Sequence, residues 1–208
     1  MGRRRTGSYA VGRERRARIL EAAAERFAER GYHRTPMAKI AADVGLTDGG
    51  LLYHFPSKKP LLLAVAEHRF SALEQWWAGL DPDAGLAAVL DEMVRSTERL
   101  LAQPGLIELS VLMAAEAADA SSPAYALFAE RYRGAVASLS AIFARCAGRG
   151  ELLPGTDCDA LARECIAVSD GLQLQWVLAD GSLDLVGGIR EHARRIADTV
   201  SAVPDGGG

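Results

Sequence analysis

Two neighbouring lysines stand where a helix is expected to begin, and their position indicates a site for anions. Lys58 and Lys59 follow Ser57, a residue type that often caps helix N-termini, and Pro60 is tolerated in a first turn. The helix dipole disfavours cations in that turn. An external anion such as a phosphate would offset the cost, and free N–H groups at the helix N-terminus would also bind it. The alternative is an ordinary surface helix with solvated lysines.

A pair of glycines forms the second chemical feature of this stretch. Gly49 and Gly50 lie in a short segment expected to be helical after Thr47, a good N-cap, to about Phe55, where Pro56 ends it. Each glycine weakens a helix by about 1 kcal/mol relative to alanine. That cost is reasonable if the backbone must come close to another molecule, whereas the plainer interpretation is a loose turn.

A further short helix precedes this segment and completes a helix-turn-helix pattern. We expect Thr35 to cap it and Pro36 to occupy its first position, where no N–H partner is needed. Gly45 is expected to end it in a left-handed conformation, followed by the apolar Leu46 in the turn. Two helices joined by a tight, glycine-containing turn are typical of DNA-binding proteins. Between these ends the apolar residues recur at helical spacing: Met37, Ile40, Ala41 and Val44.

The stretch from Thr35 to Leu61 resembles the DNA-binding signature of the TetR family of transcriptional regulators, and the resemblance covers about the first third of the chain. The chain departs from the family pattern in two places. Leu52 stands where the family most often has tyrosine, so the phosphate contact of that tyrosine falls to Tyr53. Pro60 replaces the usual acidic residue, which removes a capping box with the preceding serine. The matching residues are Thr35, Ile40-Ala41, Gly45-Leu46-Thr47, Gly49-Gly50-Leu51-Leu52-Tyr53-His54-Phe55 and Ser57-Lys58-Lys59-Pro60-Leu61.

The resemblance and the residue chemistry together predict which residues meet duplex DNA. Recognition helices present their N-terminal residues to base edges in the major groove. Asp48 is unusual there, since a carboxylate repels phosphates; it either caps backbone N–H groups or accepts a hydrogen bond from a cytosine amino group. The predicted DNA-binding residues are Thr35, Thr47, Asp48, Gly49, Gly50, Tyr53, His54 and Lys58.

The charge of the chain is distributed unevenly, which suits a protein that docks one end on nucleic acid. Residues 1–60 hold 13 Lys and Arg against 6 Asp and Glu, and the remainder holds 11 against 21. Residues 1–12 carry Arg3-Arg4-Arg5 without an apolar face, so we expect a flexible basic arm that either contacts DNA or is simply solvated. Residues 203–208 are expected to form a disordered tail.

Length and composition bound the class of protein. A chain of 208 residues holds one or two small domains. No segment resembles a signal peptide or reaches the ~20 apolar residues of a membrane span, so we expect a cytoplasmic protein with no membrane partner. The widely spaced Cys146, Cys158 and Cys165 suit reduced thiols better than a disulfide framework or a zinc site, and we expect no metal and no cofactor.

The periodicity of the remaining segments predicts an all-α fold of about nine helices. Residues 13–30 carry an apolar stripe and end at Gly31, and we expect them to pack on the helix-turn-helix. The predicted organisation is an arm at 1–12, a helix-turn-helix DNA-binding domain at 13–56, a connecting helix at 57–78, an effector-binding and dimerisation bundle at 84–202 and a tail at 203–208.

Proteins that resemble this chain use their last two helices to form a homodimer. The sequence favours the same interface, because residues 157–179 place apolar side chains on more than one side. Gly171 and the pair Gly187-Gly188 would let helices approach closely. The alternative is ordinary packing within one chain. A two-fold dimer would match a palindromic DNA operator.

The resemblance also implies a pocket for a small-molecule effector in the C-terminal helices. Asp170, Gln173 and Trp176 share a helical face by spacing, and a polar pair beside an aromatic ring can orient a ligand. Methionine and aromatic residues more often belong to a core than to a pocket wall, and that alternative stays open. The candidate walls are Met93, Met113, Tyr125, Phe128 and Tyr132.

The residues themselves predict DNA binding. The resemblance to the TetR family implies a sequence-specific transcriptional regulator, a repressor released by an effector whose identity the sequence leaves open. One alternative is an architectural DNA-coating protein without an effector, which would bind any duplex rather than one palindrome. The other is an all-α enzyme, but no nucleophile–base pair, metal-ligand spacing or phosphate-binding loop in the sequence supports it.

Overall fold

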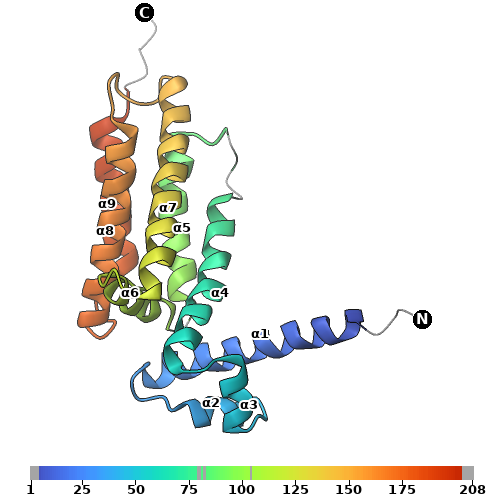
Figure 1. Ribbon diagram of the computed structural model, residues 1–208. Helices are drawn as coiled ribbons and strands as arrows, with labels where there is room; N and C mark the ends of the chain where they lie inside the picture. Colours follow the sequence, from blue (N-terminus) through green and yellow to red (C-terminus); the bar gives the residue numbers. More distant parts are fainter. Residues whose placement is uncertain (1–4, 79–80, 82, 104, 203–208) are drawn as a thin grey trace, which may run out of the picture. The chain divides into compact units, whose positions relative to one another are not determined.

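The protein is helical throughout the residues that the structure describes. The structure is a computed structural model and describes residues 5–78, 81, 83–103 and 105–202. Within these residues it has nine α-helices and no strand beyond one antiparallel bridge between Leu152 and Ser201, which confirms the all-α prediction (Figure 1). The predicted tail at 203–208 lies outside the described residues. The helices are α1 (Arg5–Arg30), α2 (Met37–Asp43), α3 (Asp48–His54), α4 (Lys58–Ala78), α5 (Leu86–Leu101), α6 (Leu106–Ala117), α7 (Pro123–Gly148), α8 (Cys158–Leu178) and α9 (Leu185–Val200).

The chain divides into two compact units. The first comprises Met1–Ala72 and Pro104–Ser110, and the second comprises Leu73–Gln103 and Val111–Gly208. The boundaries between the units fall at three places in the chain: inside α4, between α5 and α6, and inside α6. The boundaries of the functional domains that the sequence predicts, including a connecting helix at 57–78, stay a prediction.

None of the described helices is by itself long and apolar enough to span a membrane. The bent pair formed by α5 and α6 reaches the necessary length and composition only when both helices are taken together.

The first helix is longer than the sequence predicts. It begins at Arg5, so residues 5–12, expected to belong to a flexible arm, are helical, and residues 1–4 lie outside the described residues. The prediction rested on the lack of an apolar stripe, but such a stripe marks burial rather than helicity. Once the packed part of a helix has formed, each further residue costs little to add. The helix ends as predicted, with Gly31 in the left-handed region at φ 76°.

The core of the first unit is built from the apolar faces predicted for α1 to α4. Ion pairs join these helices at the rim of the core. Arg26 donates to both carboxylate oxygens of Asp43, at 2.6 and 2.7 Å, and so joins α1 to α2. Arg69 donates to Glu21 at 2.9 Å and joins α4 to α1. The buried apolar residues of this unit include Ile19, Leu20, Ala23, Phe27, Ile40, Ala41, Leu51, Phe55, Leu61, Leu62 and Val65.

Thr35 corrects one prediction about a helix cap. Its side chain is buried, and its hydroxyl donates to the carbonyl oxygens of Arg26 at 3.1 Å and Gly31 at 2.9 Å. It therefore bonds to carbonyls in the last turns of α1 and just after it rather than to the N–H groups of α2. Pro36 is the N-cap residue of α2, with φ −72° and ψ 144°, so the helix begins one residue later than predicted.

The second unit is a bundle in which α5 packs mainly on α9 and α7 on α8. The loop after α7 holds the N-terminus of α5, because Glu151 accepts a hydrogen bond from the Leu86 N–H at 2.6 Å. Burial in the bundle is mostly apolar, but α5 also buries the carboxylate of Glu92. That carboxylate accepts hydrogen bonds from Arg95 at 3.0 Å and from Arg99, which makes its burial tolerable.

Candidate nucleic-acid interface and effector region

The short helix α3 is positioned by the cap and the turn that the sequence predicts. Thr47 has an extended backbone, with φ −74° and ψ 161°, and its hydroxyl oxygen accepts a hydrogen bond from the Gly50 N–H at 3.1 Å. In the preceding turn Gly45 has φ 69°, a region that favours glycine. On the inner side Leu51 and the C-cap residue Phe55 are buried. These contacts hold a helix that would be too short to be stable alone.

One face of α3 is exposed and carries a large aromatic side chain. Asp48, Gly49, Leu52 and Tyr53 are spaced as one helical face. The side chain of Tyr53 is 88% exposed and that of Leu52 is 45% exposed. The Tyr53 ring meets the ring of His54 edge-on, with the ring centres 5.5 Å apart. A tyrosine so exposed offers both apolar area and a hydroxyl to a partner molecule.

The two glycines of α3 differ in what surrounds them. A Cβ added to Gly50 would lie 3.3 Å from the Thr47 hydroxyl oxygen and 3.7 Å from the Cβ of Leu46, so the cap itself disfavours a side chain there. A Cβ added to Gly49 would meet no atom within 4 Å. Nothing in the described part of the protein therefore requires a glycine at position 49, where the exposed backbone can be approached closely from outside.

Lys58 is the first residue of α4, and its amine is directed to the loop between α1 and α2. The ammonium nitrogen donates to the His33 carbonyl at 3.2 Å and lies 4.6 Å from the centre of the Tyr32 ring. Partial burial lowers the pKa of this amine below its usual range. The position at a helix N-terminus agrees with the prediction, whereas the contacts with Tyr32 and His33 were not predicted.

The structure brings most of the predicted DNA-binding residues together. Those on α3 or its cap are Thr47, Asp48, Gly49, Gly50, Tyr53 and His54. Thr35 stands apart, because its side chain is buried and its hydroxyl already donates to two carbonyls of α1 and the turn after it. The sequence reasoning missed the exposed Leu52, which the four-residue spacing from Asp48 would have shown. The sequence allowed one or two arginines near the start of the helix at 13–30 to meet phosphates, but it did not single out Arg16, whose guanidinium lies 4.6 Å from the centre of the Phe55 ring.

Two residues predicted separately for the effector site, Tyr132 and Asp170, meet in the second unit, although the sequence did not predict them as a pair. Tyr132 of α7 donates to the carboxylate of Asp170 of α8 at 2.5 Å, and the ring of Phe128 lies 6.1 Å from that of Tyr132. Burial, together with the hydrogen bond to Asp170, raises the pKa of Tyr132. Burial also raises the pKa of Asp170, against the opposing effects of the Tyr132 hydroxyl and the Arg131 charge. The carboxyl is thus held where its charged form is costly.

The other predicted effector residues are distributed more widely over the second unit. Gln173 is buried and donates to Ser169 at 3.0 Å, and Tyr125 is largely exposed. The ring of Trp176 lies against Gly181, and Met93 and Met113 are buried. A pocket of about 330 Å³ contains none of the eight predicted residues. It is lined by Leu86, Ala87, Leu90, Gly150, Glu151, Ala197, Ser201 and Ala202.

The two helices predicted to form a dimer expose surfaces of different character. On α8, Leu174 is 44% exposed and Leu178 is 76% exposed, one turn apart, and a Cβ on Gly171 would meet no atom within 4 Å. On α9, by contrast, Gly188 packs against Leu172 of the same chain, since a Cβ there would lie 3.2 Å from that side chain. The apolar surface left open by these contacts therefore belongs to α8.

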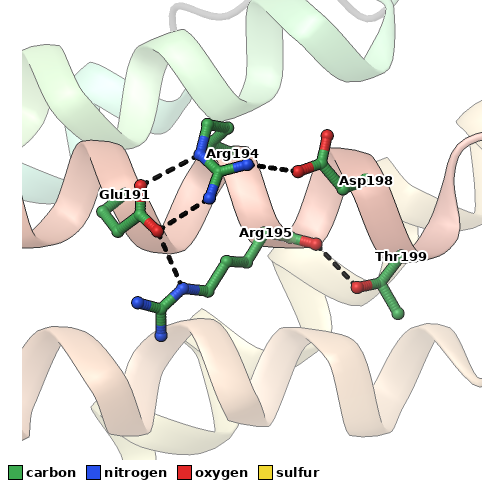
Figure 2. Close-up of polar contacts among 5 residues, drawn as sticks. All are labelled: Glu191, Arg194, Arg195, Asp198 and Thr199. Carbon is green, nitrogen blue, oxygen red and sulfur yellow. Dashed lines mark hydrogen bonds and ion pairs between the residues drawn. The ribbon is translucent and has the colours of Figure 1, made fainter.

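A network of charges covers the exposed side of α9. Figure 2 shows Arg194 between Glu191 and Asp198, with Arg195 also directed to Glu191. Arg194 donates to Glu191 at 2.8 and 2.9 Å and to Asp198 at 2.5 Å, and Arg195 donates to Glu191 at 2.9 Å. Hydrogen bonds from both arginines lower the pKa of Glu191 to about 2. All these pairs lie within one helix, so this side of α9 is satisfied by its own chain.

Comparison with the sequence models of known protein families shows which family this chain belongs to. Residues 19–65 match the sequence model of the bacterial regulatory proteins of the tetR family. Residues 82–202, more than half of the chain, match that of the C-terminal region of BetI-type transcriptional repressors. The chain belongs to the TetR family. Its family and fold are those of transcriptional regulators with a helix-turn-helix DNA-binding unit and a C-terminal helical bundle.

Two related proteins match most of the chain rather than only the DNA-binding motif, in agreement with membership of the TetR family. The fatty acid metabolism regulator protein of Bacillus subtilis is 27% identical over 170 residues, which are 81% of this chain and 86% of the relative. The transcriptional regulator TtgR of Pseudomonas putida is 28% identical over 191 residues, 86% of this chain and 87% of the relative.

Solved structures extend the comparison to three dimensions. A protein from Saccharomonospora viridis, solved in complex with choline, is 25% identical with a TM-score of 0.71, covering 91% of this chain and 99% of that one. A TetR regulator from Chloroflexus aurantiacus shares the fold with a TM-score of 0.77 at 22% identity, covering 93% of this chain and all of that one.

Proposed function

We propose that this TetR-family regulator represses transcription by binding a palindromic operator as a homodimer and that a small-molecule effector releases it. The observation that carries the proposal is the exposed face of α3, with Asp48, Gly49, Leu52 and Tyr53 on one side of a helix whose other side is buried. A recognition helix needs such an arrangement, because one face must be anchored while the other enters the major groove.

Each residue of this face has a chemical role in the proposal. Asp48, in the first turn, lies where recognition helices meet base edges, and a carboxylate accepts from the amino group of cytosine. Gly49 leaves room for the backbone to approach the bases. Tyr53 reaches a phosphate through its hydroxyl, and Lys58 adds a positive charge at the start of α4.

The homodimer is proposed to form through the last two helices, with α8 providing most of the apolar area. Leu174 and Leu178 are exposed on that helix, and the bare Gly171 on the preceding turn lets a partner helix approach. The charged side of α9 forms the polar rim, since its ion pairs are complete within one chain. A two-fold axis would place two α3 helices about 34–36 Å apart, one turn of DNA.

The effector is proposed to be a small organic cation held near Asp170. A part-buried carboxylate bonded to Tyr132, whose ring in turn contacts Phe128, is suited to an ammonium group, which gains from both the charge and the aromatic faces. The similar protein from Saccharomonospora viridis was solved with choline, and the C-terminal bundle matches the BetI-type model. The ligand would compete with the Tyr132 hydroxyl and the nearby Arg131 for this carboxylate.

The DNA part of the proposal is tested by selecting binding sites from random duplexes with the purified protein. Enrichment of one palindrome supports the proposal, whereas binding to all duplexes alike would indicate an architectural protein instead. The effector part is tested by titrating choline against the protein with and without that operator. Operator should weaken choline binding by the same factor by which choline weakens operator binding. Equal choline affinities, or no choline binding, would remove the cationic effector from the proposal.

A further inference from the structure

Residues 12–18 of α1, which directly precede the core, form an exposed and basic stretch of helix. Residues 12–18 are all exposed, although they belong to the same continuous helix as the buried stripe that follows. Four of these seven residues are arginines and only Glu14 is acidic. A helix that is polar on all sides is not held by its own core, so its composition has to be explained by solvent or by a partner.

The arginines are not spread evenly around the helix. Arg16 stands three residues before Ile19 and four before Leu20, so it extends the same face that is buried in the core. Arg13 stands three residues before Arg16, and Arg15 stands four residues before Ile19. They therefore lie on either side of Arg16 around the helix. The face of α1 that packs on the helix-turn-helix therefore changes from apolar residues to arginines where the core ends.

One of these arginines is fixed beside the recognition helix. The guanidinium of Arg16 lies 4.6 Å from the centre of the Phe55 ring, and Phe55 is the buried C-cap residue of α3. A guanidinium stacked on an aromatic ring keeps its charge and its outward hydrogen-bond donors. Figure 1 shows the N-terminal part of α1 extending beyond α2 and α3. Arg16 thus lies next to the end of α3 that carries Tyr53 and His54.

Carboxylates of the protein do not neutralise this face. Within the described residues, the arginines of the core do form ion pairs, Arg26 with Asp43 and Arg69 with Glu21, whereas no ion pair involves Arg13, Arg15 or Arg16. Three neighbouring cations on a helix repel one another unless anions lie close to them. Phosphates at regular spacing, as on duplex DNA, are anions of suitable geometry and charge.

We infer that Arg13, Arg15 and Arg16 form a phosphate-binding face for the duplex immediately outside the base pairs read by α3. These residues precede the region that matches the TetR family model, which begins at residue 19. The inference rests on the proposed function, because it takes its partner from the DNA bound by α3. It assigns no base specificity to the face, since phosphate contacts fix position and affinity but do not read sequence.

The chain offers a matched control for this face. Arg18 lies on the side of α1 opposite Arg16, three residues after Arg15, with Glu14 four residues before it and Glu25 seven residues after it. Arg13→Gln combined with Arg15→Gln removes two charges from the proposed face and leaves the contact of Arg16 with Phe55 in place. Arg18→Gln removes a charge from the same exposed helix and leaves Arg13, Arg15 and Arg16 in place.

The experiment measures the affinity of full-length variants for the selected operator at several salt concentrations, by fluorescence anisotropy. The double variant should bind more weakly, and the slope of log K against log salt should fall by about 0.9 for each phosphate that is no longer neutralised by an arginine. Arg18→Gln should leave the slope unchanged. Shortening the duplex at its ends should weaken the unmodified protein but not the double variant, because the proposed phosphates lie outside the base pairs read by α3.

Two results would overturn the inference while leaving the proposed function intact. One is an unchanged slope in the double variant, with the unmodified protein still preferring the operator. The other is an equal loss of affinity from Arg18→Gln, which would mean that net charge alone matters. If the unmodified protein shows no preference for any sequence, the proposed function fails instead, and the two failures are therefore distinguishable.

Discussion

The ammonium group of Lys58 lies over the ring of Tyr32, 4.6 Å from its centre, and donates to the neighbouring His33 carbonyl at 3.2 Å. This contact joins the first turn of α4 to the loop between α1 and α2. The ring of Tyr32 in turn meets Phe27 of α1 edge-on, with ring centres 5.4 Å apart. Lys58 therefore belongs to the packing of the first unit as well as to its charged surface, and the two roles can be separated.

Comparing a substitution of Lys58 with a substitution of Tyr32 separates the packing role of the lysine from its role as a charge. Lys58→Ala removes a charge, so affinity should fall for all DNA sequences alike and the salt slope should fall by about 0.9. Tyr32→Leu removes the ring but no charge, so the slope should not change. Both are measured by salt titration of operator binding. A Lys58→Ala variant with unchanged slope and affinity would show that the lysine contacts no phosphate.

Asp48 is predicted to read a base rather than to cap the helix. The cap of α3 is already supplied by the Thr47 hydroxyl, which accepts from the Gly50 N–H, and Asp48 itself is exposed. Asp48→Ala should therefore relax the sequence preference at one position of each half-site. Site selection with the variant and the unmodified protein measures this. An identical selected motif, accompanied by lower stability, would mean that the carboxylate serves the helix dipole instead.

The two glycines of α3 should respond in opposite ways to alanine. Gly49→Ala meets no atom of the described protein, so it should stabilise the protein by up to about 1 kcal/mol while weakening DNA binding. Gly50→Ala places its Cβ 3.3 Å from the Thr47 hydroxyl oxygen, so it should give no such gain. Thermal unfolding and operator titration of both variants provide the measurement. A Gly49→Ala variant that binds operator normally would contradict a close approach at this position.

Asp170 should make the protein less stable as pH rises above the usual range of a carboxyl. Its pKa is raised in the folded state by burial, so between the unfolded and folded pKa values the folded protein holds more protons than the unfolded one. Stability should therefore fall with rising pH across that window, and Asp170→Asn should remove this part of the slope. Tyr132→Phe removes the hydrogen-bond donor and should cost about 1–3 kcal/mol.

Denaturant unfolding of the Asp170 and Tyr132 variants across the acid range measures both effects. Thr199→Ala serves as a control on the same unit, because its hydroxyl donates only within α9, to the Arg195 carbonyl at 2.7 Å (Figure 2). An Asp170→Asn variant with the same pH slope as the unmodified protein would show that this carboxyl ionises normally.

The sequence predicted best the features that depend on neighbours in the chain. The Thr47 cap and the left-handed glycines at 31 and 45 follow from local backbone chemistry, and the structure confirms them. Thr35 was placed wrongly because its hydroxyl is drawn to carbonyls at the end of α1, which a cap rule for the following helix does not consider. The first turns of α1 were missed because their sequence shows no apolar stripe.

The sequence did not predict the contacts between segments that are distant in the chain. Lys58 contacts Tyr32, which is 26 residues away in the chain, and Arg16 contacts Phe55, which is 39 residues away. No local sequence pattern predicts either contact. The pocket beside Glu151 joins α5, the loop after α7 and the end of α9, so it too depends on tertiary packing. Spacing did place Asp170 on a suitable face, but its partner Tyr132 on another helix became visible only in the structure.

The most direct test of the account compares binding of the selected palindrome with binding of a duplex in which one half-site is scrambled. Anisotropy at fixed salt gives the two affinities, and sedimentation of the complex gives the number of chains bound. The account predicts two chains on the palindrome and an affinity at least about 10³-fold tighter than for unrelated duplex. It also predicts a large loss of affinity when one half-site is scrambled. Equal affinity for the palindrome and the scrambled duplex would contradict sequence-specific regulation by a two-fold dimer.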